Sequence, residues 1–371
     1  MTYKFQNTLN YLRAFLTDQY ENLPGIDEKT EAFAERHYVI SVLKYVENMR
    51  TGKYKDLQKS CDAVRTEHML RLQSCKQVFQ KFEEQKITYA VIKGAQVDKR
   101  AYKDLGLRPS GDLDVLIRKS DFTAVKNIFE EEGFVCGKFT SDKTIKKFTR
   151  ERLLFFNLYG HQAPTFAKIV EDSNHQKHYI EIDTNFSVTW QGDDNVFSNV
   201  DILLNETEDV TYHGIQYKAL KPELFLLQLC LHNYRDMNST HAIQQWDIGP
   251  RSLFDIYSLV YHQNNYIDID AFVAWVKKLD YVEQVCYMFY HCNQIFGQLL
   301  FMETCLDLLG FQDDDSVNTF GLIKNEKIHW TVPFEELFER ENIISLIEPL
   351  LTAQDKKNLE TTEAFMVADD G

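Results

Sequence analysis

Two aspartates separated by one residue, Asp112 and Asp114, stand at the start of an apolar run that ends at Ile117. In a β-strand, residues i and i+2 point to the same face, about 7 Å apart along the backbone, so both carboxylates can converge on one divalent ion. Carboxylate oxygens are ligands that Mg²⁺ and Mn²⁺ prefer. The pair therefore predicts a metal site at the beginning of a strand.

A glycine turn precedes the two aspartates. Gly94 follows a strand-like run at 89–93 and precedes a predicted helix over 95–102. A glycine between a strand and a helix lets backbone N–H groups approach a phosphate chain, and the start of the helix favours negative charge. Lys93 and Arg108 supply cations before and after this helix and are candidate phosphate ligands. Together these residues predict a site for a metal-bound triphosphate.

The spacing of two acids is a weak signal by itself, because Asp and Glu occupy 56 of the 371 positions. Asp268 and Asp270 have the same spacing without a glycine turn upstream, and we interpret Asp270 as the N-cap of the helix that follows. Context therefore distinguishes Asp112 and Asp114 from this second pair.

The segment from about 87 to 259 resembles the uncharacterised bacterial nucleotidyltransferases of the DNA polymerase β-like superfamily. Their pattern is Lys-Gly, then Tyr, then Arg-Pro-x-Gly-Asp-hydrophobic-Asp, and the matching residues here are Lys93-Gly94, Tyr102, Arg108-Pro109 and Gly111-Asp112-Leu113-Asp114. The resemblance implies an α+β fold, with a mixed sheet like the polymerase β palm between N-terminal and C-terminal helical lobes. It also implies a two-metal transfer of NMP from an NTP such as ATP to a hydroxyl-type acceptor, with Mg²⁺ or Mn²⁺ as cofactor and pyrophosphate as product.

The same resemblance implies which residues bind the triphosphate: Lys93, Gly94, Arg108, Ser110 and Gly111. Many superfamily members have a serine after the glycine, whose hydroxyl meets a phosphate oxygen. This chain has Ala95 there, so that contact is either absent or replaced by Lys93 or Ser110.

The superfamily also requires a third carboxylate on a neighbouring strand, and the predicted strand over 178–186 offers two. Alternation turns its isoleucines toward the core and leaves Glu181 and Asp183 on the opposite face. The family pattern favours Asp183 as the third metal ligand and the general base, with Glu181 as the alternative. Relatives usually have Asp-Leu-His-Trp at this place, whereas this chain has Asp-Thr-Asn-Phe.

Periodicity predicts an N-terminal helical lobe at 1–85 and a C-terminal helical domain at 221–355, and the polar, acidic composition of 356–371 predicts a mobile tail. The resemblance implies that the segment between the two helical parts, 86–220, is a nucleotidyltransferase catalytic domain. A hairpin with a His-Gly turn is expected over 210–217, while the region 134–160 is ambiguous. His232 interrupts an apolar helical face in the third segment. It is either a packing residue or an acceptor-site residue, because relatives place a histidine near this position.

Composition narrows the choice of partners. The net charge of −15 and the pI near 5.2 disfavour a broad nucleic-acid surface, so the acceptor is expected to be a small molecule, a peptide or a protein. Seven cysteines without a C-x-x-C pair indicate neither a disulfide framework nor a zinc site. The N-terminus lacks the apolar core of a signal peptide, and no apolar stretch approaches about 18 residues, so we expect a cytoplasmic protein without a membrane partner.

Two other functions fit parts of the sequence. A nucleotide-binding or regulatory protein that kept the fold but lost turnover is compatible with the departures at Ala95 and Asn185. A glycosyltransferase with an Asp-x-Asp metal motif would need a nucleotide-binding α/β domain before the motif. Only a predicted helical lobe and one strand-helix unit precede it here, so this reading ranks last.

Overall fold

The computed structural model describes residues 2–159, 163–172, 175–190, 199–246, 248–313, 315–322, 327–340, 342–353 and 356. Contacts divide the chain into two compact units, one of Tyr54–Leu229 with Ser258–Asp280 and the other of Met1–Lys53, Cys230–Tyr257 and Tyr281–Gly371. Helices α10 (Pro222–Asn238) and α12 (Pro250–Gln263) each contribute to both units. The predicted four-segment division stays a prediction, and its tail lies outside the described residues apart from Lys356.

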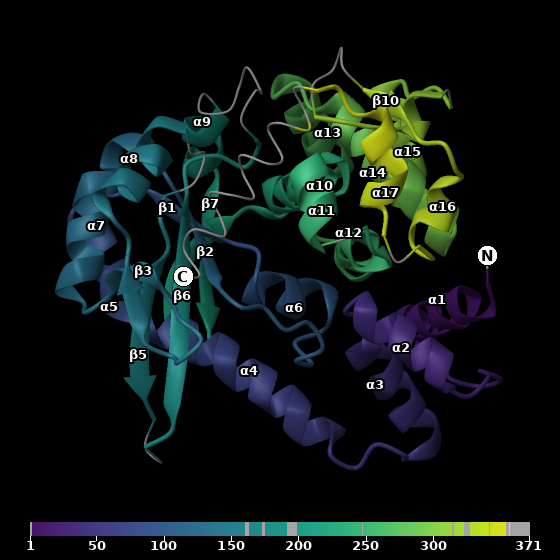
Figure 1. Cartoon of the computed structure of the whole chain (residues 1–371), viewed down its shortest axis with the longest axis horizontal. Coiled ribbons are helices and arrows are strands. Elements are labelled where there is room, and N and C mark those ends of the chain that lie inside the picture. Colours follow the sequence, from purple (N-terminus) through teal and green to yellow (C-terminus); the bar gives the residue numbers. More distant parts are fainter. Residues whose placement is uncertain are drawn as a thin grey trace. The chain divides into compact units, whose positions relative to one another are not determined.

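The first unit contains an eight-stranded mixed sheet with the strand order β4-β3-β5-β6-β2-β1-β8-β7 (Figure 1). Its strands are β1 (Tyr89–Ile92), β2 (Leu113–Ile117), β3 (Val135–Phe139), β4 (Ile145–Lys147), β5 (Phe166–Glu171), β6 (Lys177–Asn185), β7 (Thr207–Tyr212) and β8 (Ile215–Leu220). Strand β2 pairs antiparallel with β1 and parallel with β6. The mixed sheet with helices that was expected from the sequence is confirmed.

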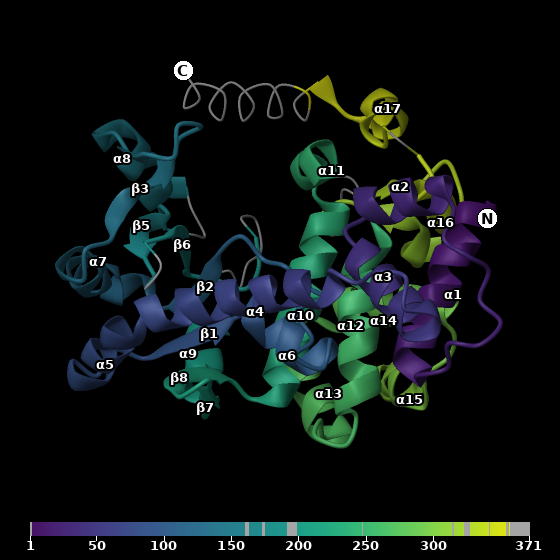
Figure 2. The same ribbon diagram turned by 90° about the horizontal axis from the view of Figure 1, so that it is seen from below.

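This unit also holds parts of α10 and α12. Its other helices are α4 (Leu57–Ser74), α5 (Lys76–Glu84), α6 (Ala95–Ala101), α7 (Phe122–Glu131), α8 (Arg150–Tyr159), α9 (Asn199–Asn205) and α13 (Ile269–Lys278). Figure 2 shows α4 and α5 following each other along the sheet. Helix α13 requires a correction, because Asp268 and not Asp270 is its N-cap. The backbone at Asp268 is extended and its carboxylate accepts a hydrogen bond from the Ala271 N–H at 2.8 Å, whereas Asp270 already lies in the first turn.

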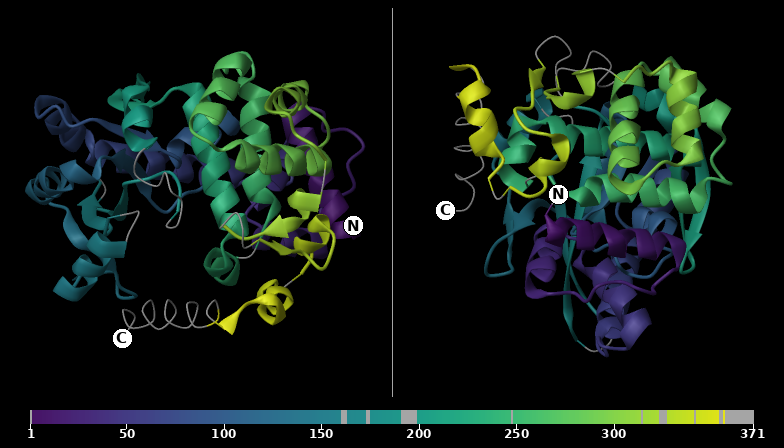
Figure 3. Two further views of the ribbon diagram at one scale, coloured as in Figure 1. Left: turned by 90° about the horizontal axis from the view of Figure 1, so that it is seen from above. Right: turned by 90° about the vertical axis from the view of Figure 1, so that its right-hand side faces the viewer.

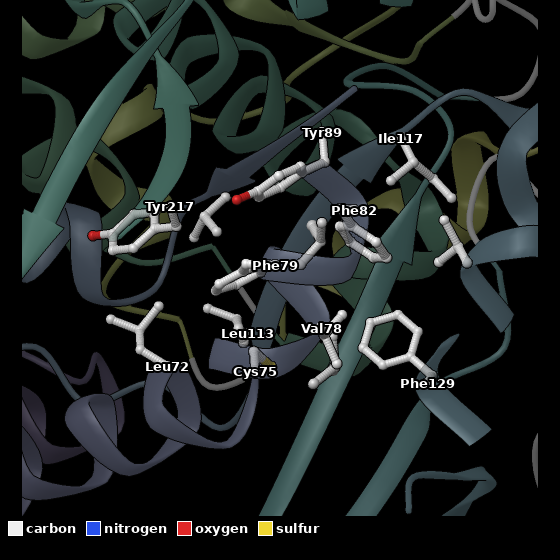
Figure 4. Close-up of a cluster of buried hydrophobic side chains, with 14 of the residues drawn as sticks. Leu72, Cys75, Val78, Phe79, Phe82, Tyr89, Leu113, Ile117, Phe129 and Tyr217 are labelled. Carbon is white, nitrogen blue, oxygen red and sulfur yellow. The ribbon is translucent and has the colours of Figure 1, made fainter. Parts of the chain in front are cut away.

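One face of the sheet is covered by a hydrophobic core (Figure 4). Alternate residues of β2 and β6, among them Leu113, Ile117 and Ile182, are buried there against α5 and α7. Phe79 of α5 stacks on Tyr89 of β1 with ring centroids 5.2 Å apart. Because side chains alternate along a strand, burying this set turns the intervening residues of β2 and β6 to the opposite face.

The second unit is mainly helical and comprises α1 (Tyr3–Thr17), α2 (Glu28–Arg36), α3 (Ile40–Thr51), α11 (Thr240–Trp246), α14 (Val282–Phe296), α15 (Leu300–Leu309), α16 (Phe334–Leu337), α17 (Ile344–Ile347) and a strand pair, β9 (Thr319–Phe320) with β10 (Ile328–His329), besides parts of α10 and α12. Helices α14 and α15 pack side by side within it (Figure 3). All seven cysteines of the chain are free thiols. Among the helices built from described residues, none combines the length and the apolar character that crossing a bilayer demands.

Candidate active site

Three carboxylates from two strands converge on the face of the sheet opposite the core. Asp112, Asp114 and Asp183 each offer one oxygen, and these oxygens lie within 4.8 Å of one another. The parallel register of β2 and β6 sets Asp114 directly beside Asp183, and Asp112 immediately precedes β2. Of the described His, Cys, Asp and Glu side chains, these three form the group whose spacing suits a metal ion.

The charges of this acidic cluster repel one another. Burial, followed by the negative charges of Asp114 and Asp112, raises the pKa of Asp183 to about 7. Burial and Asp114 likewise raise the pKa of Asp112, although the cations Lys93 and Arg71 oppose the shift. A hard divalent cation would relieve this repulsion, and oxygen donors are the ligands that it prefers. The donor set therefore fits Mg²⁺ or Mn²⁺.

Their contacts distinguish the two candidates for the third carboxylate, Asp183 and Glu181. The Asp183 carboxylate accepts a hydrogen bond from the Thr165 hydroxyl at 2.7 Å and belongs to the cluster. Glu181 lies two residues earlier on β6, outside the cluster, and its carboxylate accepts a long hydrogen bond of 3.5 Å from the Phe139 N–H. The geometry thus brings Asp183, and not Glu181, to Asp112 and Asp114.

Asp114 is held by neighbours on both sides. The Lys93 ammonium lies 2.9 Å from its Oδ1, and the Asn185 side-chain amide donates to the same oxygen at 3.0 Å. Only 3% of Asp114 is exposed, so these contacts restrict its carboxylate in a desolvated setting. The sequence places Asn185 on the face of the strand that carries Asp183, as a departure from the relatives' histidine, but it does not predict this contact with Asp114. Its place on the same strand face as Asp183 was the available signal.

The turn before α6 has an unusual backbone. Lys93 and Gly94 have φ angles of +58° and +51°, and ψ at Gly94 is −125°. A Cβ built on Gly94 would stand 3.5 Å from Ser110 Oγ and from the Asp112 carbonyl oxygen, an ordinary contact distance. The backbone angles, and not crowding, therefore demand glycine here.

The loop that carries Arg108 is anchored by a buried carboxylate that sequence reasoning did not identify. Asp98 of α6 is fully buried and accepts hydrogen bonds from the N–H groups of Gly106, Leu107 and Arg108 at 3.0, 3.1 and 3.0 Å. Burial raises its pKa to about 6. At Gly106, a Cβ would lie 2.2 Å from the Cys61 carbonyl oxygen, so this loop packs directly on α4.

Comparison with known proteins places this geometry in a family. A sequence model of a family described as uncharacterised nucleotidyltransferase matches residues 38–297. This chain belongs to that family. The match spans the glycine turn, the three aspartates and the loop with Arg108, and no curated protein matches the chain.

Two solved structures are similar to this chain. An antigenic nucleotidyltransferase-like protein from Paracoccidioides brasiliensis is 15% identical with a TM-score of 0.29, and the match covers 56% of this chain and 88% of that one. JHP933 from Helicobacter pylori is 12% identical with a TM-score of 0.30, and that match covers 66% and 89%.

The structure also places the remaining predicted site residues. Ser110 donates its hydroxyl to the Asp112 carbonyl at 3.0 Å, and nothing lies within 4 Å of a Cβ built on Gly111. Ala95 begins α6 and has no hydroxyl to offer. His232 belongs to the second compact unit, where its ring lies 3.3 Å from the Asp236 carboxylate, so its acceptor-site role stays a prediction.

Proposed function

We propose that this nucleotidyltransferase is a member of the polymerase β-like superfamily that moves an NMP group from an NTP to an acceptor and releases pyrophosphate. The observation that supports it best is the convergence of Asp112, Asp114 and Asp183 beside the Gly94 turn. An acidic cluster next to a loop with positive φ angles combines the two requirements of the reaction, a metal site and a place for phosphates.

The three aspartates would hold Mg²⁺ or Mn²⁺, two ions in the full proposal. Bound there, the cations would stabilise the charge on the attacking and leaving oxygens of an in-line displacement at the α-phosphorus. Asn185 and Lys93 fix Asp114 through the contacts at 3.0 and 2.9 Å, so its carboxylate is oriented before any ligand arrives.

Asp183 accepts the proton of the attacking hydroxyl in this proposal. The triphosphate would be bound by cationic side chains, a hydroxyl and loop backbone, namely Lys93, Arg108, Ser110, Gly94 and Gly111. Because Ala95 replaces the serine of many superfamily members, Ser110 supplies the hydroxyl in this set. Its Oγ would lie 3.5 Å from a Cβ built on Gly94.

The acceptor is proposed to be a small molecule, a peptide or a protein. A net charge of −15 repels nucleic acids over most of the surface, so a polynucleotide acceptor is disfavoured. A second function, nucleotide binding without turnover, is favoured by the departures from the relatives' pattern at Ala95 and Asn185.

The test is pyrophosphate release from each of the ribonucleoside triphosphates with Mg²⁺ or Mn²⁺, with and without candidate acceptors. We expect metal-dependent release that Asp112→Asn and Asp114→Asn each abolish while the fold persists, because an amide lacks the charge that a hard cation needs. Asp268→Asn is the matched control, since asparagine also caps helices. Triphosphate binding without release under every condition would favour the second function, and equal losses at 268 and 112 would contradict the metal assignment.

A further inference from the structure

Helix α4 carries a buried cation, Arg71, with N–H groups that have no hydrogen-bond acceptor among the described residues. Only 7% of Arg71 is exposed, and its Nη2 lies 3.8 Å from Glu67 Oε2, too far for a hydrogen bond. Its Nε and Nη1 are buried and make no hydrogen bond within the described part of the chain. A guanidinium that is desolvated without acceptors is costly, so a side chain retained in this state indicates a role in binding.

Arg71 acts electrostatically on the acidic cluster. Helix α4 contacts β6, which it crosses in the view of Figure 1. Burial lowers the pKa of Arg71, and the carboxylates of Glu67, Asp112 and Glu181 act in the opposite direction. The guanidinium thus lies near the active-site face of the sheet, on a helix that the sequence predicts only as part of the N-terminal helical lobe.

A second unpartnered group lies one turn before Arg71. His68 is 2% exposed, and neither ring nitrogen has a hydrogen-bond partner among the described residues. Residues three apart share one helix face, so His68 and Arg71 are neighbours on α4. Burial and the charges of Arg71 and Arg108 lower the pKa of His68 to about 4, which leaves a neutral ring with one N–H to donate at pH 7.

We propose that Arg71 and His68 bind an oxyanion, a phosphate or carboxylate group, of a molecule that occupies the active site. This inference rests on the proposed function, because it takes the acidic cluster to be the reaction centre. A cation with spare donors beside a neutral imidazole N–H matches an oxyanion and no cationic or apolar group. The oxyanion belongs either to the phosphate chain of the nucleotide or to the acceptor.

Isothermal titration of the full chain distinguishes these two sources. The first arm titrates MgATP and magnesium pyrophosphate, and the second titrates inorganic phosphate into protein saturated with a non-hydrolysable triphosphate. Arg71→Met is expected to weaken binding in one of the two arms by about tenfold to a hundredfold, the range for a hydrogen bond to a charged group. A loss in the first arm assigns the nucleotide phosphates, and a loss confined to the second assigns the acceptor.

Lys59→Met is the control on the same helix. Its side chain is exposed, so the change should leave both arms within about twofold. Where Arg71→Met does not fold, Arg71→Lys and His68→Leu replace it, since each removes donors that the proposal uses. Unchanged binding in both arms for folded variants at 71 and 68 would overturn the proposal.

Failure of this inference is distinguishable from failure of the proposed function. The titrations require no turnover, so anion binding that depends on Arg71 in a protein that never releases pyrophosphate would refute transfer and keep the anion site. Pyrophosphate release by a protein whose affinity for these anions does not depend on Arg71 would support transfer and refute the anion site.

Discussion

At the scale of single residues, the turn at Lys93 and Gly94 is the most constrained point of the site. Both residues occupy positive φ, and Lys93 does so although it carries a Cβ and ion-pairs with Asp114. Left-handed angles are costly for residues other than glycine, and such strain concentrates at functional positions. The turn is therefore a place where stability and binding can be separated by experiment.

Gly94→Ala is expected to lower the free energy of unfolding by about 1–3 kcal/mol, the cost of holding a residue with a Cβ in a sparsely populated positive-φ conformation. The change should also weaken MgATP binding, because the proposed phosphate contacts come from this turn. Gly214→Ala in the β7–β8 turn is the control, because its φ of +77° imposes the same kind of strain and nothing lies within 4 Å of its Cβ. Urea unfolding and isothermal titration measure both variants. Equal affinity losses, or none at 94, would remove the phosphate role from this turn.

A second residue-scale prediction concerns Asp98. Asparagine would keep Oδ1 as acceptor for two N–H groups but would oppose the Gly106 N–H with its own amide donor. Leaving a buried donor unsatisfied costs about 1–3 kcal/mol, so Asp98→Asn should lower stability by that amount and weaken MgATP binding through the displaced Arg108 loop. Asp209→Asn, an exposed partner of Lys218, should change neither measurably. A stability loss with unchanged affinity would separate this loop from nucleotide binding.

Local chemistry in the sequence was enough to find the glycine turn and the Asp-x-Asp strand, because both depend on neighbouring residues. The roles of the other site residues depend on tertiary contacts, which the local sequence does not show. Arg71 lies in a helix that the sequence predicts only as part of the N-terminal helical lobe, and nothing in the sequence shows that its guanidinium is buried and acts on Asp112. Asp98 likewise gains its role only when the loop at 106–108 folds back onto α6.

At the scale of elements, α4 is tied to the β5–β6 hairpin by a histidine. The His178 ring lies 3.1 Å from a Glu67 oxygen of α4 and 3.2 Å from an Asp172 oxygen after β5. Burial lowers the pKa of His178, but the two acceptors raise it further, so the net shift is upward. When it is protonated, the ring can donate to both carboxylates, and Glu67 lies on the helix that carries Arg71.

This tie predicts a pH dependence with a definite sign. Because the folded pKa of His178 exceeds the unfolded value of about 6.5, its contribution to stability is complete below that pH and is lost as pH rises through the folded pKa. Urea unfolding from acidic to alkaline pH should show this loss, and His178→Gln should remove it. His175→Asn, at a side chain that is 91% exposed, should retain the wild-type profile. An identical profile in His178→Gln would contradict the tie.

The sequence predicts whether a segment is a helix or a strand more readily than it predicts what that segment packs against. The strand over 178–186 and the hairpin over 210–217 correspond to β6 and β7–β8 within a few residues. Periodicity does not say what an element packs against, and α4 and α5, predicted within an N-terminal lobe, share their unit with the sheet. The ambiguous region 134–160 holds two short strands, β3 and β4, and α8.

At the scale of the whole molecule, ligand binding should be visible as stabilisation. A ligand that binds only the folded state adds about 2.7 kcal/mol of stability at a hundred times its Kd, so MgATP or another magnesium triphosphate should raise the melting temperature. EDTA should reverse the shift, and Asp114→Asn should not show it. A shift of equal size without metal would favour nucleotide binding without turnover.

The parallel pairing of β2 with β6 makes the acidic cluster a property of the finished sheet. Asp112 and Asp114 adjoin each other along one short segment, but Asp183 joins them only when a distant strand docks in register. A slip of one residue would set Thr184 opposite Asp114 and turn Asp183 toward the core face. Pairing across such a separation is a late and slow event in folding. A nascent or partly unfolded chain therefore lacks the complete set of carboxylates. A single residue inserted into β6 would abolish the proposed activity although the sequence would still encode all three aspartates.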